Sequence, residues 1–126
     1  MKVIFFEVDN VLNFPNSDAV APSGAKGAAD SCIKKFRNIL TETGAKAVLF
    51  GKWAKEWDFA ESKCTQDGLY LNKKTERKGL HILDKVNPVL AERDGIFDWL
   101  ERHNNVTEYC VMKDINDPVE WSEHNE

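Results

Sequence analysis

Four short apolar runs occur along the chain. Those over residues 3–6, 45–50 and 106–112 contain many β-branched and aromatic residues, as is typical of strands buried on both faces of a parallel sheet. A fourth run, over residues 80–86, fits a strand or an extended connection and ends at Pro88. The hydrophobic pattern therefore predicts at least three buried strands.

Two amphipathic segments lie between these runs. The first follows Asp30 or Ser31, either of which fits a helix N-cap, and Gly44 fits its C-terminal end. The second covers residues 91–103. One face of each segment is apolar: Ile33, Phe36, Ile39 and Leu40 in the first, and Ile96, Trp99 and Leu100 in the second. Both segments are predicted helices.

Strands that alternate with helices predict a three-layer α/β domain with a small, Rossmann-like central parallel sheet. We expect the first strand, residues 2–8, to lie between the strands at 45–50 and 106–112, because all three are apolar enough to be covered on both faces. The 126 residues form one domain by size.

Three segments lack a clear period. Residues 14–27 predict a long loop, which either covers a site or is an irregular connection. Residues 55–90 are interpreted as a small insert packed over the sheet, with a turn at Asp67-Gly68. Residues 118–126 are mainly polar and predict a flexible tail.

Composition narrows the classes of function. A net charge of −4 and a pI near 5.4 argue against general nucleic-acid binding, and the one local basic cluster, at 73–78, is a solvated face or a docking patch. No apolar run is long enough for a membrane span, and no signal-peptide pattern precedes the first strand, which together predict a cytoplasmic protein. The three cysteines have no metal-ligand spacing and fit free thiols: Cys32, Cys64 and Cys110.

Two acidic residues follow the first strand directly. Glu7 and Asp9 are two positions apart, so in strand geometry their side chains emerge on the same side, beyond the carboxyl end where open α/β sheets bind ligands. Two close carboxylates repel unless a cation, a proton or a basic side chain lies between them. The alternative is a solvated acidic turn. Spacing alone favours neither reading.

The stretch KVIFFEVDNVLN resembles the first motif of haloacid dehalogenase-like (HAD) phosphatases, and in particular a small subgroup whose motif ends in Val-Leu-Asn. The resemblance places Glu7 at the position of the nucleophilic Asp and Asp9 at that of the general acid/base, while Asn10 replaces a Gly. Glu7 is one methylene longer than Asp, and a displacement of the attacking atom by roughly 1 Å can cost about a hundredfold in rate.

The segment after residues 45–50 resembles the family's second motif, in which a Ser hydroxyl binds the phosphoryl oxygens. Phe50 and Gly51 stand at the Ser positions and Ala54 at an Arg position, while Trp53 matches the family. The resemblance therefore implies a vestigial phosphate site at Phe50 and Gly51 that lacks side-chain donors.

The resemblance continues to the last apolar strand. Arg93 matches the cation that steadies the nucleophile and the phosphoryl group, with Lys85 and Lys78 as fallback candidates. The family's final motif reads Asp-Asp and supplies a Mg²⁺ ligand. Here Lys113 takes its first position and Asp114 keeps the second. Family members continue into further sheet and helix, so we expect this chain to be short at its C-terminal end.

These substitutions favour a HAD-fold pseudoenzyme, a binding or regulatory protein that has lost phosphoryl transfer. We expect such a protein to bind no cofactor. This hypothesis includes a protein partner. An alternative is a weak Mg²⁺-dependent phosphatase with catalytic Glu7, Asp9 and Arg93, in which Glu7 and Asp114 bind the metal. A third hypothesis is an engineered variant of an active enzyme. In the first hypothesis the ammonium of Lys113 replaces the metal, or else it swings out to solvent.

Overall fold

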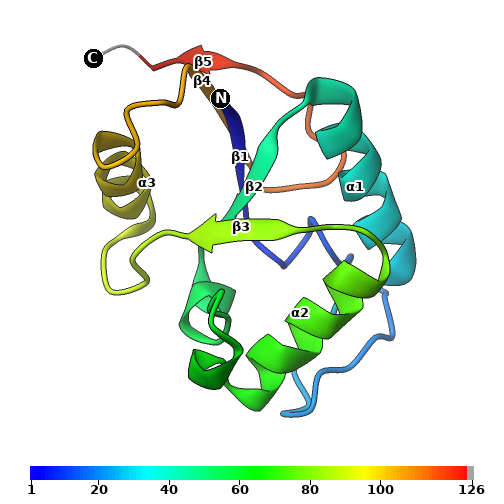
Figure 1. The fold of residues 1–126 in the computed structure, drawn as a ribbon. Coiled ribbons are helices and arrows are strands. Elements are labelled where there is room, and N and C mark those ends of the chain that lie inside the picture. Colours follow the sequence, from blue (N-terminus) through cyan, green and yellow to red (C-terminus); the bar gives the residue numbers. More distant parts are fainter. Residues whose placement is uncertain (125–126) are drawn as a thin grey trace.

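In a computed structural model that describes residues 1–124, five strands form one sheet and three α-helices pack against it (Figure 1). The strands are β1 (Lys2–Phe6), β2 (Lys46–Leu49), β3 (Ile82–Lys85), β4 (Glu108–Met112) and β5 (Ser122–Glu123). The helices are α1 (Asp30–Thr43), α2 (Gln66–Arg77) and α3 (Glu92–Glu101), with short 3₁₀ helices at Lys52–Lys55 and Glu61–Lys63.

The strand order is β3-β2-β1-β4-β5. The first four strands run parallel, and β5 is antiparallel to β4. Phe5 of β1 lies opposite Val48 of β2 and Val111 of β4. The predicted position of the first strand, between the strands at 45–50 and 106–112, is therefore confirmed. The sheet belongs to a small α/β domain with mostly parallel strands.

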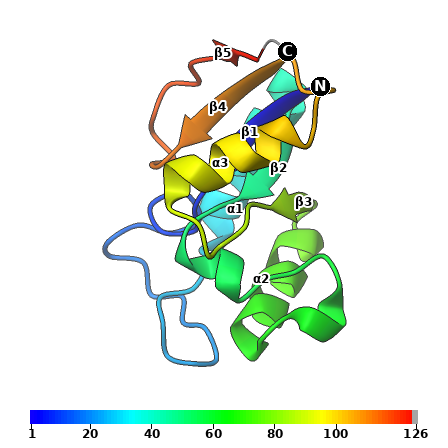
Figure 2. The ribbon, with the colours of Figure 1, turned by 90° about the vertical axis from the view of Figure 1, so that its left-hand side faces the viewer.

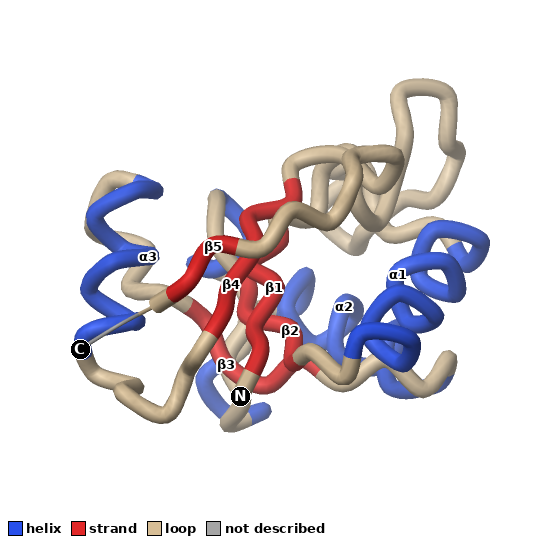
Figure 3. Tube along the Cα trace, turned by 90° about the horizontal axis from the view of Figure 1, so that it is seen from above, coloured by secondary structure: helices blue, strands red, loops and turns tan. Residues whose placement is uncertain are grey.

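Helices cover both faces of the sheet, with α1 and α2 on one side and α3 on the other (Figure 3). Side chains alternate along β1, so Ile4 and Phe6 pack into the core beneath α1 and α2, whereas Val3 and Phe5 pack beneath α3. Trp99 of α3 meets the Phe5 ring edge-on. The sheet is the middle of three layers.

The first helix matches its predicted end but not its predicted cap. Gly44 ends α1 with a φ of 72°, and its amide donates to the Leu40 carbonyl. Ala29 stands at the N-cap without a side-chain hydrogen bond, and Asp30 is the first helical residue. Asp30 instead lies near the ammonium groups of Lys74 and Lys78 on α2. The acid thus links two helices on the same face.

The segment predicted as an insert contains α2 and β3, and so it is the crossover that adds the edge strand β3 to the sheet. The turn predicted at Asp67-Gly68 is wrong, because both residues lie in the first turn of α2 and the Thr65 side chain caps it. A Cβ on Gly68 would lie 1.9 Å from the Glu56 carbonyl oxygen. Glycine is present here for close packing rather than for a turn.

The long loop over 14–27 lies against α2. The buried Asp67 accepts hydrogen bonds from the amide and the hydroxyl of Ser23. The Tyr70 hydroxyl accepts from the Ala28 amide, and a Cβ on Gly27 would meet that hydroxyl at 2.2 Å. These contacts, made by α2 side chains, hold the loop in place.

Residues 118–124 do not form the expected flexible tail. Ser122 and Glu123 pair with Tyr109 and Glu108 of β4, and Trp121 packs against the core beneath α1 and α2. The Lys2 ammonium lies 5.2 Å from the centroid of the Trp121 ring. The last two positions of the predicted tail, 125–126, lie outside the described residues.

Candidate functional site

A cavity of about 220 Å³ opens at the carboxyl edge of the sheet. Three connections contribute to it: the loop after β1, the 3₁₀ turn after β2, and the start of α3. Figure 2 shows the loop after β1 leaving the sheet near the carboxyl end of β4. Glu7 and Asp9, the two acidic residues that follow β1, both line this cavity. The side chains and backbone that line it belong to Glu7, Asp9, Gly51, Lys52, Trp53 and Glu92.

The loop after β1 is fixed by one buried amide. Asn13 is 1% exposed, and its Oδ1 accepts a hydrogen bond from the Asn10 amide at 2.9 Å. Its Nδ2 donates to Asp9 Oδ1 at 3.0 Å and to the Gly27 carbonyl at 3.1 Å. Asn10 has a φ of 69°, a left-handed conformation that Asn tolerates better than most residues. Asn10 therefore suits a position where the family has Gly, and Asn13 orients the Asp9 carboxylate.

Asp9 is already paired with a cation. The Lys52 ammonium lies 2.8 Å from Asp9 Oδ2, although the Lys52 side chain is 74% exposed. Burial acts to raise the pKa of Asp9, but the hydrogen bonds from Asn13 and Lys52 outweigh it, so this pKa lies below its ordinary value. The same contact raises the pKa of Lys52. The pair is ionised at neutral pH.

Glu7 has the opposite electrostatic environment. Burial raises its pKa, and the nearby carboxylates of Glu92 and Asp9 raise it further. Lys113 and Lys52 act in the other direction without cancelling the shift. The first motif thus contains one carboxyl group that ionises easily, Asp9, and one that resists ionisation, Glu7.

The segment after β2 contributes backbone atoms to the cavity but no side-chain hydroxyl group. Gly51 has φ 87° and ψ −166°, a combination open essentially to glycine alone. A Cβ at this position would lie 3.3 Å from the Glu7 Cβ. Phe50 points away into the core beneath α3, and Trp53 is buried on the other side. Gly51, which the resemblance matched to a phosphate-binding Ser, therefore has a backbone conformation that a Ser adopts only with strain.

Arg93 does not line the cavity, although it lies in the first turn of α3 as expected. Its guanidinium carbon lies 5.6 Å from the centroid of the Phe97 ring. The neighbouring residue, Glu92, lines the cavity instead. The start of α3 therefore contributes a negative charge to the cavity, whereas the family resemblance implied a positive one.

The two fallback cations have other partners. The Lys85 ammonium donates to the carbonyls of Ala54 and Trp57, at 2.8 and 2.7 Å, and so clamps the 3₁₀ turn after β2. Lys78 lies 3.9 Å from the Asp30 carboxylate, between α1 and α2. Neither lysine lines the cavity.

The residues matched to the family's last motif are only indirectly connected to the cavity. Lys113 pairs with Glu92 at 3.2 Å, and both side chains are at least half exposed. The hypothesis that the Lys113 ammonium replaces a metal beside Glu7 finds no ion pair between these two residues within 1–124. Lys113 instead acts on Glu7 from a distance, by lowering its pKa. Asp114 accepts a hydrogen bond from the Asn116 amide, 2.9 Å away, within a turn.

A magnesium ion does not fit this donor set as it is arranged. Lys52 already occupies one oxygen of Asp9, and a turn engages Asp114. Across residues 1–124, no group of three or more His, Cys, Asp or Glu side chains could hold a metal ion.

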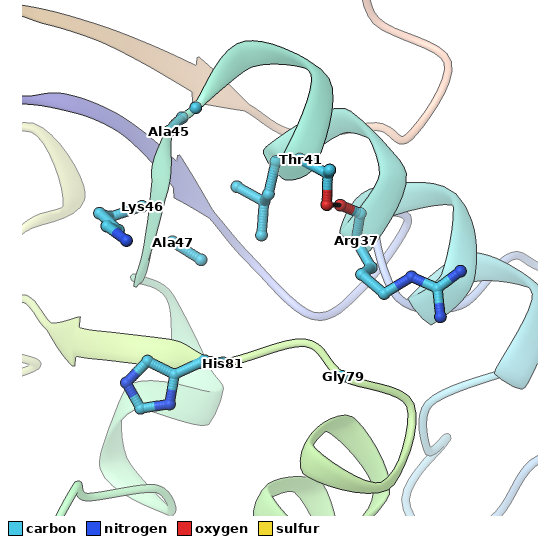
Figure 4. Close-up of a pocket in the computed structure, with 9 residues that line it drawn as sticks. Arg37, Thr41, Ala45, Lys46, Ala47, Gly79 and His81 are labelled. Carbon is cyan, nitrogen blue, oxygen red and sulfur yellow. Dashed lines mark hydrogen bonds between the residues drawn. The ribbon is translucent and has the colours of Figure 1, made fainter.

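A second cavity, of about 310 Å³, lies at the opposite edge of the sheet, where β2 and β3 begin (Figure 4). The Arg37 guanidinium there donates to the Lys78 carbonyl, and the exposed His81 ring lies 2.9 Å from Glu76. Ligands of open parallel sheets bind at the carboxyl edge. The cavity beside Glu7 and Asp9 is therefore the stronger candidate.

Sequence reasoning missed three residues of the site. Lys52 follows Gly51, and Glu92 precedes Arg93, so both are adjacent to positions that the resemblance had marked. Asn13 was used to identify the motif, but no structural role was predicted for it. The sequence shows the sign of each of these charges, but it does not show which residue each charge pairs with.

No family model, curated protein or solved structure matches this chain. The fold class therefore rests on the structure, and the function has to be argued from the site. Within residues 1–124, no helix is long and apolar enough to cross a membrane.

Proposed function

We propose that this protein is a HAD-type pseudoenzyme, a binding or regulatory protein that does not transfer phosphoryl groups. One observation carries the proposal: the carboxylate at the general acid/base position, Asp9, is already held by Lys52 and Asn13. A general acid must be protonated and able to reach the leaving group. An ionised, paired carboxylate does neither.

The pKa shifts support the same proposal. In the family's chemistry the first carboxylate attacks and the second donates a proton. Here burial raises the pKa of Glu7, while the hydrogen bonds from Asn13 and Lys52 lower that of Asp9. The shifts are the reverse of those that the two roles require.

The phosphate side of the site adds further support. Gly51 has a backbone conformation that disfavours a hydroxyl-bearing residue, and Arg93 lies outside the cavity. Loss of one preorganised donor to a transition state costs about 3 kcal/mol in well-studied enzymes. The missing donors therefore add to the defect at Glu7.

The test is hydrolysis of p-nitrophenyl phosphate with and without Mg²⁺, by the unmodified protein and by Glu7→Asp. We expect turnover far below about 1 per second for both proteins, because the Asp9–Lys52 pair persists in the variant. We also expect Mg²⁺ to leave the melting temperature unchanged. Turnover of the unmodified protein at that rate would overturn the proposal.

A weak Mg²⁺-dependent phosphatase is the second candidate, favoured by one observation: Glu7 and Asp9 do line the same cavity. This candidate predicts that Mg²⁺ raises the melting temperature of the unmodified protein by binding preferentially to the folded state. The pseudoenzyme proposal predicts such a rise only after a carboxylate is restored, as in Lys113→Asp.

We further propose a cytoplasmic location, a protein partner, and no general affinity for nucleic acid. The free thiols support the location, and the net charge of −4 supports the lack of affinity for nucleic acid. Fluorescence anisotropy with a random DNA duplex tests the last of them, and tight binding at physiological salt would contradict it.

A further inference from the structure

A groove of about 410 Å³ runs between α3 and β4, next to the cavity beside Glu7 and Asp9. It exists because α3 alone covers this face of the sheet and leaves the outer part of β4 uncovered. Phe97 on α3 is 42% exposed and Val111 on β4 is 38% exposed, which are high values for residues of their size. Four residues supply its apolar lining: Ile96, Phe97, Tyr109 and Val111.

Three charged residues lie along the same groove: Glu92, Arg93 and Lys113. Lys113 and Glu92 form an ion pair, whereas Arg93 forms no ion pair within residues 1–124. The Arg93 guanidinium lies over the Phe97 ring, at 5.6 Å from its centroid. A stacked guanidinium still has its N–H edge available for a bidentate carboxylate. The groove therefore combines an apolar lining with a net positive charge.

We infer that this groove is a binding site for a small amphipathic monocarboxylate, an aromatic or medium-chain aliphatic acid. The ligand's carboxylate binds Arg93 and Lys113, and its apolar body covers Phe97 and Val111. A carboxylate complements the groove because two cations face only one acid there. This inference does not depend on the pseudoenzyme proposal.

The size of the groove favours a small molecule over a protein. A volume of about 410 Å³ lies within the range of small-molecule sites. A stable protein interface instead buries about 800 Å² on each partner. The exposed apolar residues that line the groove, Phe97 and Val111, are too few for such an interface.

Glu92 lines both the groove and the cavity beside Glu7 and Asp9. Lys113, which pairs with Glu92, also lowers the pKa of Glu7. A ligand carboxylate at Lys113 adds a negative charge nearby, so it should raise the pKa of Glu7 further. Binding of a ligand in the groove should therefore be detectable as a rise in the pKa of Glu7.

The test compares 2-naphthoate with the neutral 2-naphthamide, measured by ¹H–¹⁵N chemical-shift titration. We expect the acid to shift the amides of Phe97 and Val111, and to bind at least about tenfold more tightly than the amide, as a charge-assisted contact provides. The double variant Arg93→Met/Lys113→Met should lose this preference. Val111→Asp should weaken both ligands, and Arg102→Met, at the C-cap of α3, is the matched control.

Equal affinity for acid and amide, shifts centred on Arg37 and His81 at the opposite edge, or no binding at millimolar concentration would overturn the inference. Melting temperatures of all variants establish that each is folded. A rise in the pKa of Glu7 on naphthoate binding, followed by NMR, gives a second readout that a purely structural role for Lys113 would not produce.

Discussion

The two faces of the sheet are covered unequally. Beneath α1 and α2, side chains from both helices, the strands and the loop after β1 form one large cluster of buried residues. Beneath α3 the cluster is smaller, and the outer part of β4 stays partly exposed. The well-covered face has the features expected of a structural core, whereas the other face has both the groove and, at its edge, the cavity with Glu7 and Glu92.

The difference between the two faces indicates where this fold can accept amino-acid substitutions with little loss of stability. A side chain in a close-packed core loses many contacts when it is shortened, while one beside a groove loses few. Function in such a domain is therefore expected on the α3 side. The predictions below test this contrast, from the largest expected effect to the smallest.

Shortening a buried aromatic on the well-covered face should have the largest effect. Phe36 is fully buried and its ring lies 4.9 Å from that of Phe6. We expect Phe36→Ala to lower the free energy of unfolding by about 3–5 kcal/mol, and Val111→Ala by less than about 1 kcal/mol. Urea denaturation measures both values. Similar losses for the two variants would contradict the contrast between the faces.

Two helical glycines form a matched pair across the sheet. A Cβ on Gly68 of α2 would collide with the Glu56 carbonyl oxygen, at 1.9 Å, whereas on Gly95 of α3 it would meet Val86 Cγ2 at 3.2 Å. We expect Gly68→Ala to destabilise the protein by about 1–3 kcal/mol. Gly95→Ala should be neutral to within about 1 kcal/mol, because helix propensity offsets the tight contact. Thermal unfolding ranks the two variants, and a reversed order would contradict the packing argument.

Neutralising Glu7 should stabilise the α3 side slightly. Its folded-state pKa is raised, mainly by burial, so its ionisation costs stability as the pH rises above its ordinary value of 4.5. We expect Glu7→Gln to be more stable than the parent at pH 7, by less than about 1 kcal/mol because the group is partly solvated, and equal to it at acidic pH. Melting temperatures between pH 4 and 8 test the sign.

Removing Lys52 should change a pKa more than it changes stability. The pair with Asp9 is largely exposed, and such pairs contribute about 0–1 kcal/mol. In Lys52→Met the pKa of Asp9 should rise towards its ordinary value, which NMR titration measures. Lys55→Met, in the same 3₁₀ turn, is the control and should leave that pKa unchanged. An unchanged pKa in Lys52→Met would show that Asn13 alone holds it low.

The elements predicted from sequence are those with strong apolar patterns. β1, β2 and β4 are continuous apolar runs, and α1 repeats its buried residues at helical spacing. By contrast α2 was missed, because Leu71 is its only large apolar residue that is fully buried and a Gly lies in its first turn. Its position depends on tertiary contacts, such as that of Asp67 with Ser23, which no local pattern contains.

The site was predicted in part for a similar reason. Glu7 and Asp9 are close in sequence, so strand spacing alone brings them to the same edge. Lys52 and Glu92 join them from two other connections, and their positions follow from which loops meet at that edge. The partner of Lys113, Glu92, could not be chosen from the sequence, because a long, exposed ammonium has several carboxylates within reach.

The central position of β1 has a consequence for folding during synthesis. Strand β1 is synthesised well before its neighbour β4, with Lys2 opposite Glu108 and Phe6 opposite Met112. Until β4 leaves the ribosome, one edge of an apolar strand has no partner. Such pairings raise the contact order and slow folding, and the unpaired edge is exposed to aggregation in the meantime. The nascent chain should therefore be most prone to aggregation before β4 has been translated.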